Sequence, residues 1–148
     1  MIATVLAAND AFYAAFSAGD LNAMDAMWAR EHAVSCTHPG REALESRENV
    51  MASWQLIFRA RDGLHARAEG ASVCLSGAMA VVICYEKLGT ASGRTLGVLA
   101  ATNVFIREGD AWRLVHHHAS GITSPDDDDD DDADDSDETP GAPGGVLN

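Results

Sequence analysis

Two histidines near the end of the chain have a spacing that suggests chemistry. His116 and His118 lie two residues apart in the segment WRLVHHHAS. In an extended strand, residues i and i+2 point to the same side. We therefore expect Trp112, Leu114, His116 and His118 to share one face of a strand. Because histidine titrates near neutral pH, such a pair is a candidate for acid–base catalysis, with His116 as a proton carrier.

A third histidine, His38, widens the choice of chemistry. It could act as a catalytic base, or it could join His116 and His118 in holding a zinc ion, since catalytic zinc sites use three protein ligands and one open position. The alternative is that these imidazoles are neutral and line a pocket or an interface through hydrogen bonds. Acid–base chemistry needs no cofactor, so we expect no cofactor and assign no metal ligands.

Four further residues are candidates because of their surroundings. Asn103 lies in an apolar stretch, where its amide needs a hydrogen-bonding partner or a ligand. Tyr13 and Trp54 lie among apolar helical residues and are either core or pocket wall. Glu86 is typical of a solvated or ion-paired carboxylate. We expect Tyr13, Trp54, Asn103 and His118 to line a ligand pocket, with His38 and His116 as its catalytic groups.

The elements that would position these residues are helices followed by strands. An amphipathic helix is predicted over residues 3–18, a second one after Asp20, and a third after Asn49. A short extended piece, 34–38, separates the second and third helices. Strands are predicted over 65–76, 79–90, 95–107 and 111–119, joined by short hairpin connections. Helices that precede an antiparallel meander indicate an α+β fold with the helices on one face of the sheet.

Composition divides the chain into two parts. The net charge is −13, but 11 of the 23 acidic residues lie within 126–138. We predict a folded domain over 1–124 and a disordered acidic and Gly/Pro-rich tail over 125–148. Without the acidic run, 12 acidic residues face 10 basic ones and the arginines are scattered, which argues against nucleic-acid binding.

The N-terminal segment and the hydropathy pattern indicate where in the cell the protein is expected. No apolar segment approaches the roughly 20 residues that a membrane-spanning helix needs. The N-terminus also has no basic region before its apolar run, so it is unlike a secretory signal. We therefore expect a cytoplasmic protein with no membrane partner.

Five segments together resemble the SnoaL-like branch of the nuclear-transport-factor-2-like (NTF2-like) superfamily. They are FYAAFSAGDLNAMDAMWA, VSCTHPG, ENVMASWQLIF, ATNVFIRE and WRLVHHHAS, and the resemblance covers residues 5–122. It implies a cystatin-like cone, in which three N-terminal helices pack in the concave face of a curved, mainly antiparallel sheet. It also implies an apolar pocket with a few polar groups, and a homodimer formed through the outer face of the sheet.

The superfamily includes ketosteroid isomerases, polyketide cyclases and dehydratases, as well as members without known activity. The isomerases use a tyrosine on the first helix, a carboxylate base after the second helix and a protonated aspartate on a later strand. Tyr13 matches the first position. Cys36 and His38 lie near the second, where no carboxylate is present, and Asn103 lies near the third. The resemblance therefore implies the pocket but not the isomerase base.

These observations lead to one main hypothesis and two alternatives. We expect a pocket protein for a small apolar or amphipathic ligand, which as an enzyme would be a cofactor-free isomerase, cyclase or dehydratase. In that role Tyr13 and Asn103 would donate hydrogen bonds to a developing oxyanion. The alternatives are a non-catalytic association module and a histidine-liganded metal enzyme.

Overall fold

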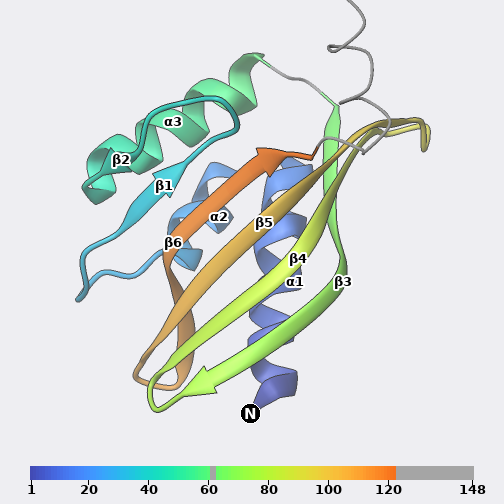
Figure 1. Ribbon diagram of the computed structural model, residues 1–148. Coiled ribbons are helices and arrows are strands. Elements are labelled where there is room, and N and C mark those ends of the chain that lie inside the picture. Colours follow the sequence, from blue (N-terminus) through green and yellow to red (C-terminus); the bar gives the residue numbers. More distant parts are fainter. Residues whose placement is uncertain (61–62, 123–148) are drawn as a thin grey trace, which may run out of the picture.

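The computed structural model describes residues 1–60 and 63–122 (Figure 1). The domain boundary predicted at residue 124 and the predicted tail lie outside these residues. Three helices precede most of the sheet: α1 (Ile2–Ala18), α2 (Leu21–Met27) and α3 (Arg47–Ala60). Within the described residues, no helix is long and apolar enough to cross a membrane.

The ends of the first two helices follow from local chemistry. Gly19 adopts the left-handed conformation with φ of 61°, and its N–H bonds to the carbonyl groups of Ala15 and Phe16, which ends α1. The side chain of Asp20 then accepts a hydrogen bond of 3.1 Å from the N–H of Ala23 and caps α2. The predictions of the first helix and of the Asp20 cap are confirmed.

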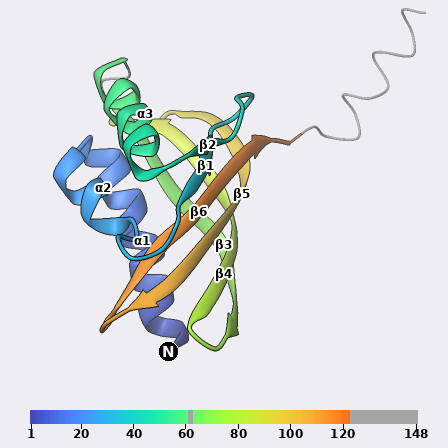
Figure 2. The ribbon, with the colours of Figure 1, turned by 90° about the vertical axis from the view of Figure 1, so that its left-hand side faces the viewer.

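The sheet has six strands in the order β2-β1-β6-β5-β4-β3. Their bounds are Ser35–Thr37 (β1), Leu44–Glu45 (β2), Leu64–Ser76 (β3), Met79–Thr90 (β4), Thr95–Glu108 (β5) and Ala111–Gly121 (β6). All neighbours are antiparallel except β1, which runs parallel to β6. The helices cover one face of the curved sheet (Figure 2), so the prediction of an α+β fold with the helices on one face is confirmed.

A β-bulge in β6 decides which histidine faces the helices. Phe105 pairs with Leu114, but Val104 pairs with His116, so Val115 is an extra residue without a partner. The extra residue inverts the alternation of side chains after Leu114. His117, which pairs with Asn103, therefore shares the inner face with Leu114, and the prediction that His116 and His118 share that face is wrong.

The core lies between α1, α3 and the inner face of the sheet. Its largest fully buried side chains are Phe12 from α1, Met24 from α2, Trp28 after α2, Trp54 from α3, and Phe105 and Leu114 from the sheet. Trp54 makes edge-on contacts with Phe12 and Phe16, with ring centroids 5.6 and 5.4 Å apart. These large rings fix the distance at which α1 and α3 lie from the strands.

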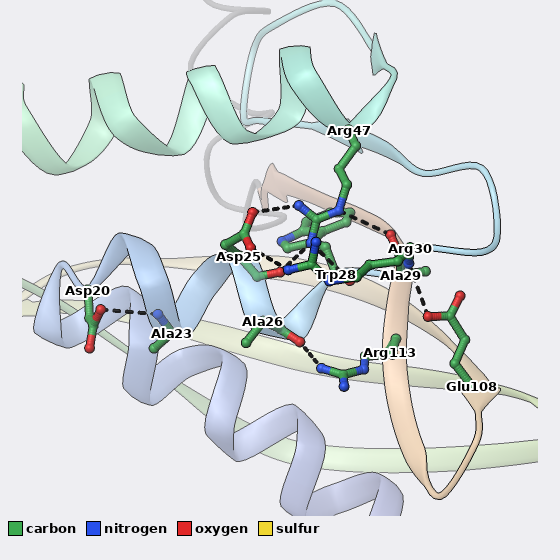
Figure 3. A network of polar contacts seen from close by, with 10 residues as sticks. All are labelled: Asp20, Ala23, Asp25, Ala26, Trp28, Ala29, Arg30, Arg47, Glu108 and Arg113. Carbon is green, nitrogen blue, oxygen red and sulfur yellow. Dashed lines mark hydrogen bonds and ion pairs between the residues drawn. The ribbon is translucent and has the colours of Figure 1, made fainter.

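Two charged side chains hold the segment between α2 and β1 (Figure 3). The guanidinium of Arg47 donates to the carboxylate and the carbonyl of Asp25 and to the carbonyls of Trp28 and Ala29. The carboxylate of Glu108 accepts hydrogen bonds from the backbone N–H groups of Arg30 (3.0 Å) and Glu31 (2.9 Å). These contacts set the path by which the chain enters β1.

The charged form of Glu108 is favoured in the folded protein. Desolvation works against it, but the N–H donors of Arg30 and Glu31 and the ring of His32, 2.8 Å away, lower the pKa of Glu108 to about 2. Because this pKa lies below the ordinary value of 4.5, the stabilisation is complete above about pH 4.5 and is lost as the pH falls toward 2.

We predict that Glu108→Gln lowers the free energy of unfolding at pH 7 by about 1–2 kcal/mol, because hydrogen bonds to a charged acceptor are lost. The difference from the unmodified protein should shrink as the pH falls from 4.5 toward 2. Urea unfolding followed by circular dichroism at several pH values measures both effects. Glu42→Gln, at an exposed glutamate, is the control, and an equal loss in both variants would contradict the role of Glu108.

Candidate active site

Five polar side chains form one buried cluster between α1 and the sheet. Asn9 and Tyr13 lie one turn apart on α1, and Glu86, Asn103 and His117 come from β4, β5 and β6. Each of the five residues is at most 3% exposed. Buried polar groups require partners, so the geometry of this cluster shows which protons each group holds.

Asn103 is the centre of the cluster. Its Nδ2 donates to Oδ1 of Asn9 at 2.8 Å and to the hydroxyl oxygen of Tyr13 at 3.2 Å. Its Oδ1 lies 2.5 Å from Nδ1 of His117. An amide oxygen only accepts, so Nδ1 of His117 carries the proton and donates it. Nε2 of the neutral ring is then an acceptor, and it lies 3.9 Å from Oε2 of Glu86.

Glu86 is a carboxylate in an apolar interior. The hydroxyl of Tyr13 donates to its Oε2 at 3.5 Å, and among the described residues no lysine or arginine forms an ion pair with it. Burial raises the pKa of Glu86 to about 7, and the hydrogen bond from Tyr13 partly opposes this shift. The group is therefore close to half-protonated at neutral pH. The prediction that Glu86 is solvated or ion-paired is wrong, because the residue is 2% exposed and its two nearest partners, Tyr13 and His117, are neutral.

The neighbours of Glu86 remain neutral at the same pH. Burial, with smaller contributions from other histidines, lowers the pKa of His117 to about 3. Burial also raises the pKa of the Tyr13 hydroxyl, and the nearby Glu86 and Cys84 add to that shift. Tyr13 thus remains a proton donor and His117 a proton acceptor, while Glu86 is the group that changes its protonation near pH 7.

Trp54 separates the cluster from the outer end of the helices. Its ring centroid lies 5.9 Å from that of His117 on one side and 5.9 Å from that of Phe58 on the other. Its indole N–H is buried and has no hydrogen-bonding partner among the described residues. Beyond this wall lies a cavity of about 270 Å³, whose lining includes Phe16, Ser17, Ile57, Phe58 and Leu64.

His38 lies beside the cluster, against Trp54. The ring centroids of His38 and Trp54 are 4.9 Å apart, and those of His38 and His117 are 6.5 Å apart. The hydroxyl of Ser53 donates to the carbonyl of Val50, so its oxygen can only accept a second hydrogen bond. Nε2 of His38 therefore donates to the Ser53 oxygen at 2.9 Å. Burial lowers the pKa of His38 to about 4, so the ring is neutral at pH 7.

His116 and His118 are on the other face of the sheet, away from the cluster. Nδ1 of His116 lies 2.7 Å from the Ser35 hydroxyl, and the two imidazole centroids are 6.3 Å apart. The three histidines of the zinc hypothesis are thus split between two faces. Over residues 1–60 and 63–122, no three His, Cys, Asp or Glu side chains are placed to hold a metal ion.

Of the predicted pocket residues, Tyr13, Trp54 and Asn103 lie in or against the cluster, while His118 does not. The predicted catalytic residue His116 also lies away from the cluster. Sequence reasoning did not select His117, and it considered Glu86 only as a solvated or ion-paired carboxylate. For Glu86 a signal existed, because it alternates with Val82 and Cys84 on one face of β4 and both of those side chains are buried. For His117 no comparable signal exists, because the bulge that turns it inward contains an ordinary valine.

A family model described as "SnoaL-like domain" matches residues 5–125. A Streptomyces avermitilis protein, named as a candidate dehydratase of the NTF2-like family, is 32% identical, with a TM-score of 0.78 over 83% of this chain and 96% of that one. A Thiobacillus denitrificans protein, named as a candidate calcium/calmodulin-dependent protein kinase type II association domain, is 37% identical, with a TM-score of 0.73 over 81% and 96%.

The F-box protein SKIP8 of Arabidopsis thaliana is 28% identical over 122 residues, which are 82% of this chain and 51% of that protein. The chain thus spans about half the length of this curated relative. Solved structures described as having a cystatin-like fold also match, at identities that show the fold alone.

We predict that Glu86→Gln changes how stability depends on pH. A folded-state pKa raised from 4.5 to about 7 means that Glu86 stabilises the fold fully below pH 4.5 and that this contribution is lost as the pH rises through 7. Between pH 4.5 and pH 8, the stability of the variant relative to the unmodified protein should therefore increase by on the order of 2–3 kcal/mol. Urea unfolding across this range measures it. Glu45→Gln is the matched exposed control, and a constant difference for Glu86→Gln would contradict the raised pKa.

Proposed function

The chain belongs to the SnoaL-like domain family, and we propose that it binds a small molecule inside its cone and moves a proton on it through Glu86. The observation that carries this proposal is a carboxylate that is 2% exposed and has no cationic partner among the described residues. An isolated buried carboxylate destabilises a fold, and a carboxyl with a pKa near 7 is suited to general acid–base catalysis. The proposed reaction class is a cofactor-free isomerisation, cyclisation or dehydration.

The proposed roles follow from the proton positions in the cluster. Glu86, when ionised, takes a proton from the carbon next to a carbonyl group. The neutral hydroxyl of Tyr13, which donates to Glu86 without a ligand, donates instead to the oxygen on which negative charge develops. The protonated Glu86 then returns the proton to another carbon in an isomerisation, or gives it to a leaving hydroxyl group, which departs as water.

His117 and Asn103 support Glu86 in this proposal. Asn103 holds His117 in the Nδ1–H form, which leaves Nε2 without a proton, 3.9 Å from Oε2 of Glu86. His117, and not His116, is thus the histidine beside Glu86, and Glu86 carries the proton. His38, which contacts Trp54 and donates to Ser53, has a positioning role here, because it holds the indole that covers the cluster.

The proposed ligand is apolar or amphipathic. The surroundings of the cluster are aromatic, with Phe12 and Trp54 against His117, and the unpartnered indole N–H of Trp54 offers one donor to a ligand oxygen. Ile57 and Phe58 contribute apolar side chains to the cavity next to Trp54. The Streptomyces relative named as a candidate dehydratase is consistent with this chemistry.

A second candidate function, association through the outer face of the sheet, has its own observation. Ile83 and Tyr85 on β4 are 58% and 52% exposed, and Leu96 and Val98 on β5 are 55% and 37% exposed. Large apolar side chains grouped on an exposed face are typical of an interaction surface. We propose that this face forms a homodimer, and the Thiobacillus relative named as a candidate association domain supports it. The two functions are compatible because they use opposite faces of the same strands.

The catalytic proposal predicts proton exchange with solvent. When 4-hydroxybutan-2-one and a panel of larger β-hydroxy ketones are incubated with the protein in D₂O, at least one should exchange hydrogen next to its carbonyl or lose water. Glu86→Gln should slow this reaction by about 10²–10⁴-fold, the contribution usual for a general acid–base group. Proton NMR of the ketones measures the rates. Glu45→Gln is the control, and equal rates in the two variants would contradict the role of Glu86.

The dimer proposal predicts that Ile83→Glu produces a monomer, because two buried carboxylates without partners would face each other across the interface. Size-exclusion chromatography with light scattering measures the mass. Leu56→Glu is a matched control, since Leu56 is 66% exposed but lies on α3, away from the outer sheet face. A monomeric unmodified protein, or dimers of both variants, would remove this proposal.

A further inference from the structure

A second cavity, of about 340 Å³, lies at the end of the sheet where the β4–β5 hairpin turns. It is formed by Ser17 at the end of α1, by residues 65–67 of β3, by residues 87–91 in β4 and its turn, and by residues 93–95 leading into β5. Figure 1 shows the tip of this hairpin reaching past the start of β3. Ser17 also lines the first cavity, so both cavities border the end of α1.

The backbone of the hairpin gives this cavity a fixed rim. The pairing of β4 with β5 shifts register between Leu88 and Gly89, which bends the hairpin. A Cβ atom at position 89 would lie 2.8 Å from the carbonyl oxygen of Arg94, so only glycine fits where the two backbones approach. The N–H of Thr90 also donates to this carbonyl at 2.9 Å. These constraints hold Arg94 next to the end of β4.

The cavity is rich in positive charge. Its lining includes Arg67, Lys87 and Arg94. One carboxylate, that of Glu69, serves two of them, at 2.9 Å from Arg67 and 3.7 Å from Lys87. Among the described residues Arg94 makes no ion pair. Two cations that share one carboxylate, with a third that has no ion pair, repel each other, and a bound anion would relieve this repulsion.

The floor of the cavity adjoins the acid–base cluster. Ser17 lies one helical turn beyond Tyr13 on α1, which is about 6 Å along the axis. Leu88 lies two residues beyond Glu86 on β4, which is about 7 Å along the strand. Both Ser17 and Leu88 line the cavity. The cavity therefore lies within about 7 Å of Tyr13 and Glu86, measured along α1 and β4.

We infer that the cavity lined by Arg67, Lys87 and Arg94 binds an oxyanion, either a carboxylate or a phosphate, and that the ligand of this protein carries such a group. The hydroxyl of Thr95, which also lines the cavity, supplies a neutral donor beside the cations. That this anion belongs to the ligand acted on by Glu86 rests on the proposed function, whereas the anion site itself rests on the cavity and its charges.

Binding of simple probes to the full chain tests this inference without any catalysis. Butanoate, neutral butanamide of the same size, and inorganic phosphate are titrated at low ionic strength while backbone amide NMR signals of Gly89, Thr90 and Arg94 are followed. Butanoate or phosphate should shift these signals in a saturable way, and butanamide should bind at least about tenfold more weakly, because each hydrogen bond to a charged group contributes about 1.5–3 kcal/mol.

Charge-removing variants locate the site. Arg94→Gln and Lys87→Gln should each weaken the binding of the anion about tenfold or more, while Arg41→Gln, which removes an exposed arginine outside the cavity, should leave it unchanged. The amide spectra also report whether each variant is folded. Equal shifts with butanoate and butanamide, or unchanged anion binding in Arg94→Gln, would overturn the inference.

The result of the anion-binding experiment can be told apart from the result of the proton-exchange experiment. If the anions bind at this cavity but no β-hydroxy ketone exchanges through Glu86, the anion site stands and the acid–base function fails. If exchange depends on Glu86 but butanoate and phosphate do not bind at residues 87–95, the function stands and the anionic class of ligand is wrong.

Discussion

The hydrogen bonds of the Asn103 side chain hold the interior of this protein together. Its amide group bonds to Asn9 and Tyr13 on α1 and to His117 on β6, so one side chain on β5 joins a helix to a neighbouring strand. Because a buried amide must use its donors and acceptor, these bonds fix the proton on Nδ1 of His117 and leave Nε2 as an acceptor. The environment of Glu86 then follows, with a neutral donor in Tyr13, a neutral acceptor in His117 and an aromatic wall.

The fold could be predicted from the sequence because local signals and tertiary structure agree. The Gly19–Asp20 pair marks the end of one helix and the start of the next, and the turns at Ser76–Gly77 and Glu108–Gly109–Asp110 separate long alternating strands. The inward side of β6 could not be predicted, since alternation is a local rule and one extra residue at Val115 inverts it. For Glu86, the alternation with Val82 and Cys84 indicated an inward side chain, but its neutral partners Tyr13 and His117 are a property of the packed structure.

The arrangement separates two possible activities physically. Along β5, Asn103 points to the helices, while Val98 lies on the exposed face with Ile83 and Tyr85 of the adjacent strand. A partner on the outer face would therefore not compete with a ligand in the cone. The relatives named for dehydration and for association share this fold, which is a reason to argue function from side chains and not from topology.

The protonation of Glu86 is the central claim, and it can be measured directly. Carbon NMR of the protein labelled at glutamate side-chain carboxyls, with Glu86→Gln used to assign the signal, gives the pKa of this group. We predict a pKa near 7 for Glu86, and a still higher one in Tyr13→Phe, where the hydrogen bond that favours the carboxylate is lost. An ordinary value near 4.5, unchanged by Tyr13→Phe, would contradict both the buried cluster and the proton transfer proposed for it.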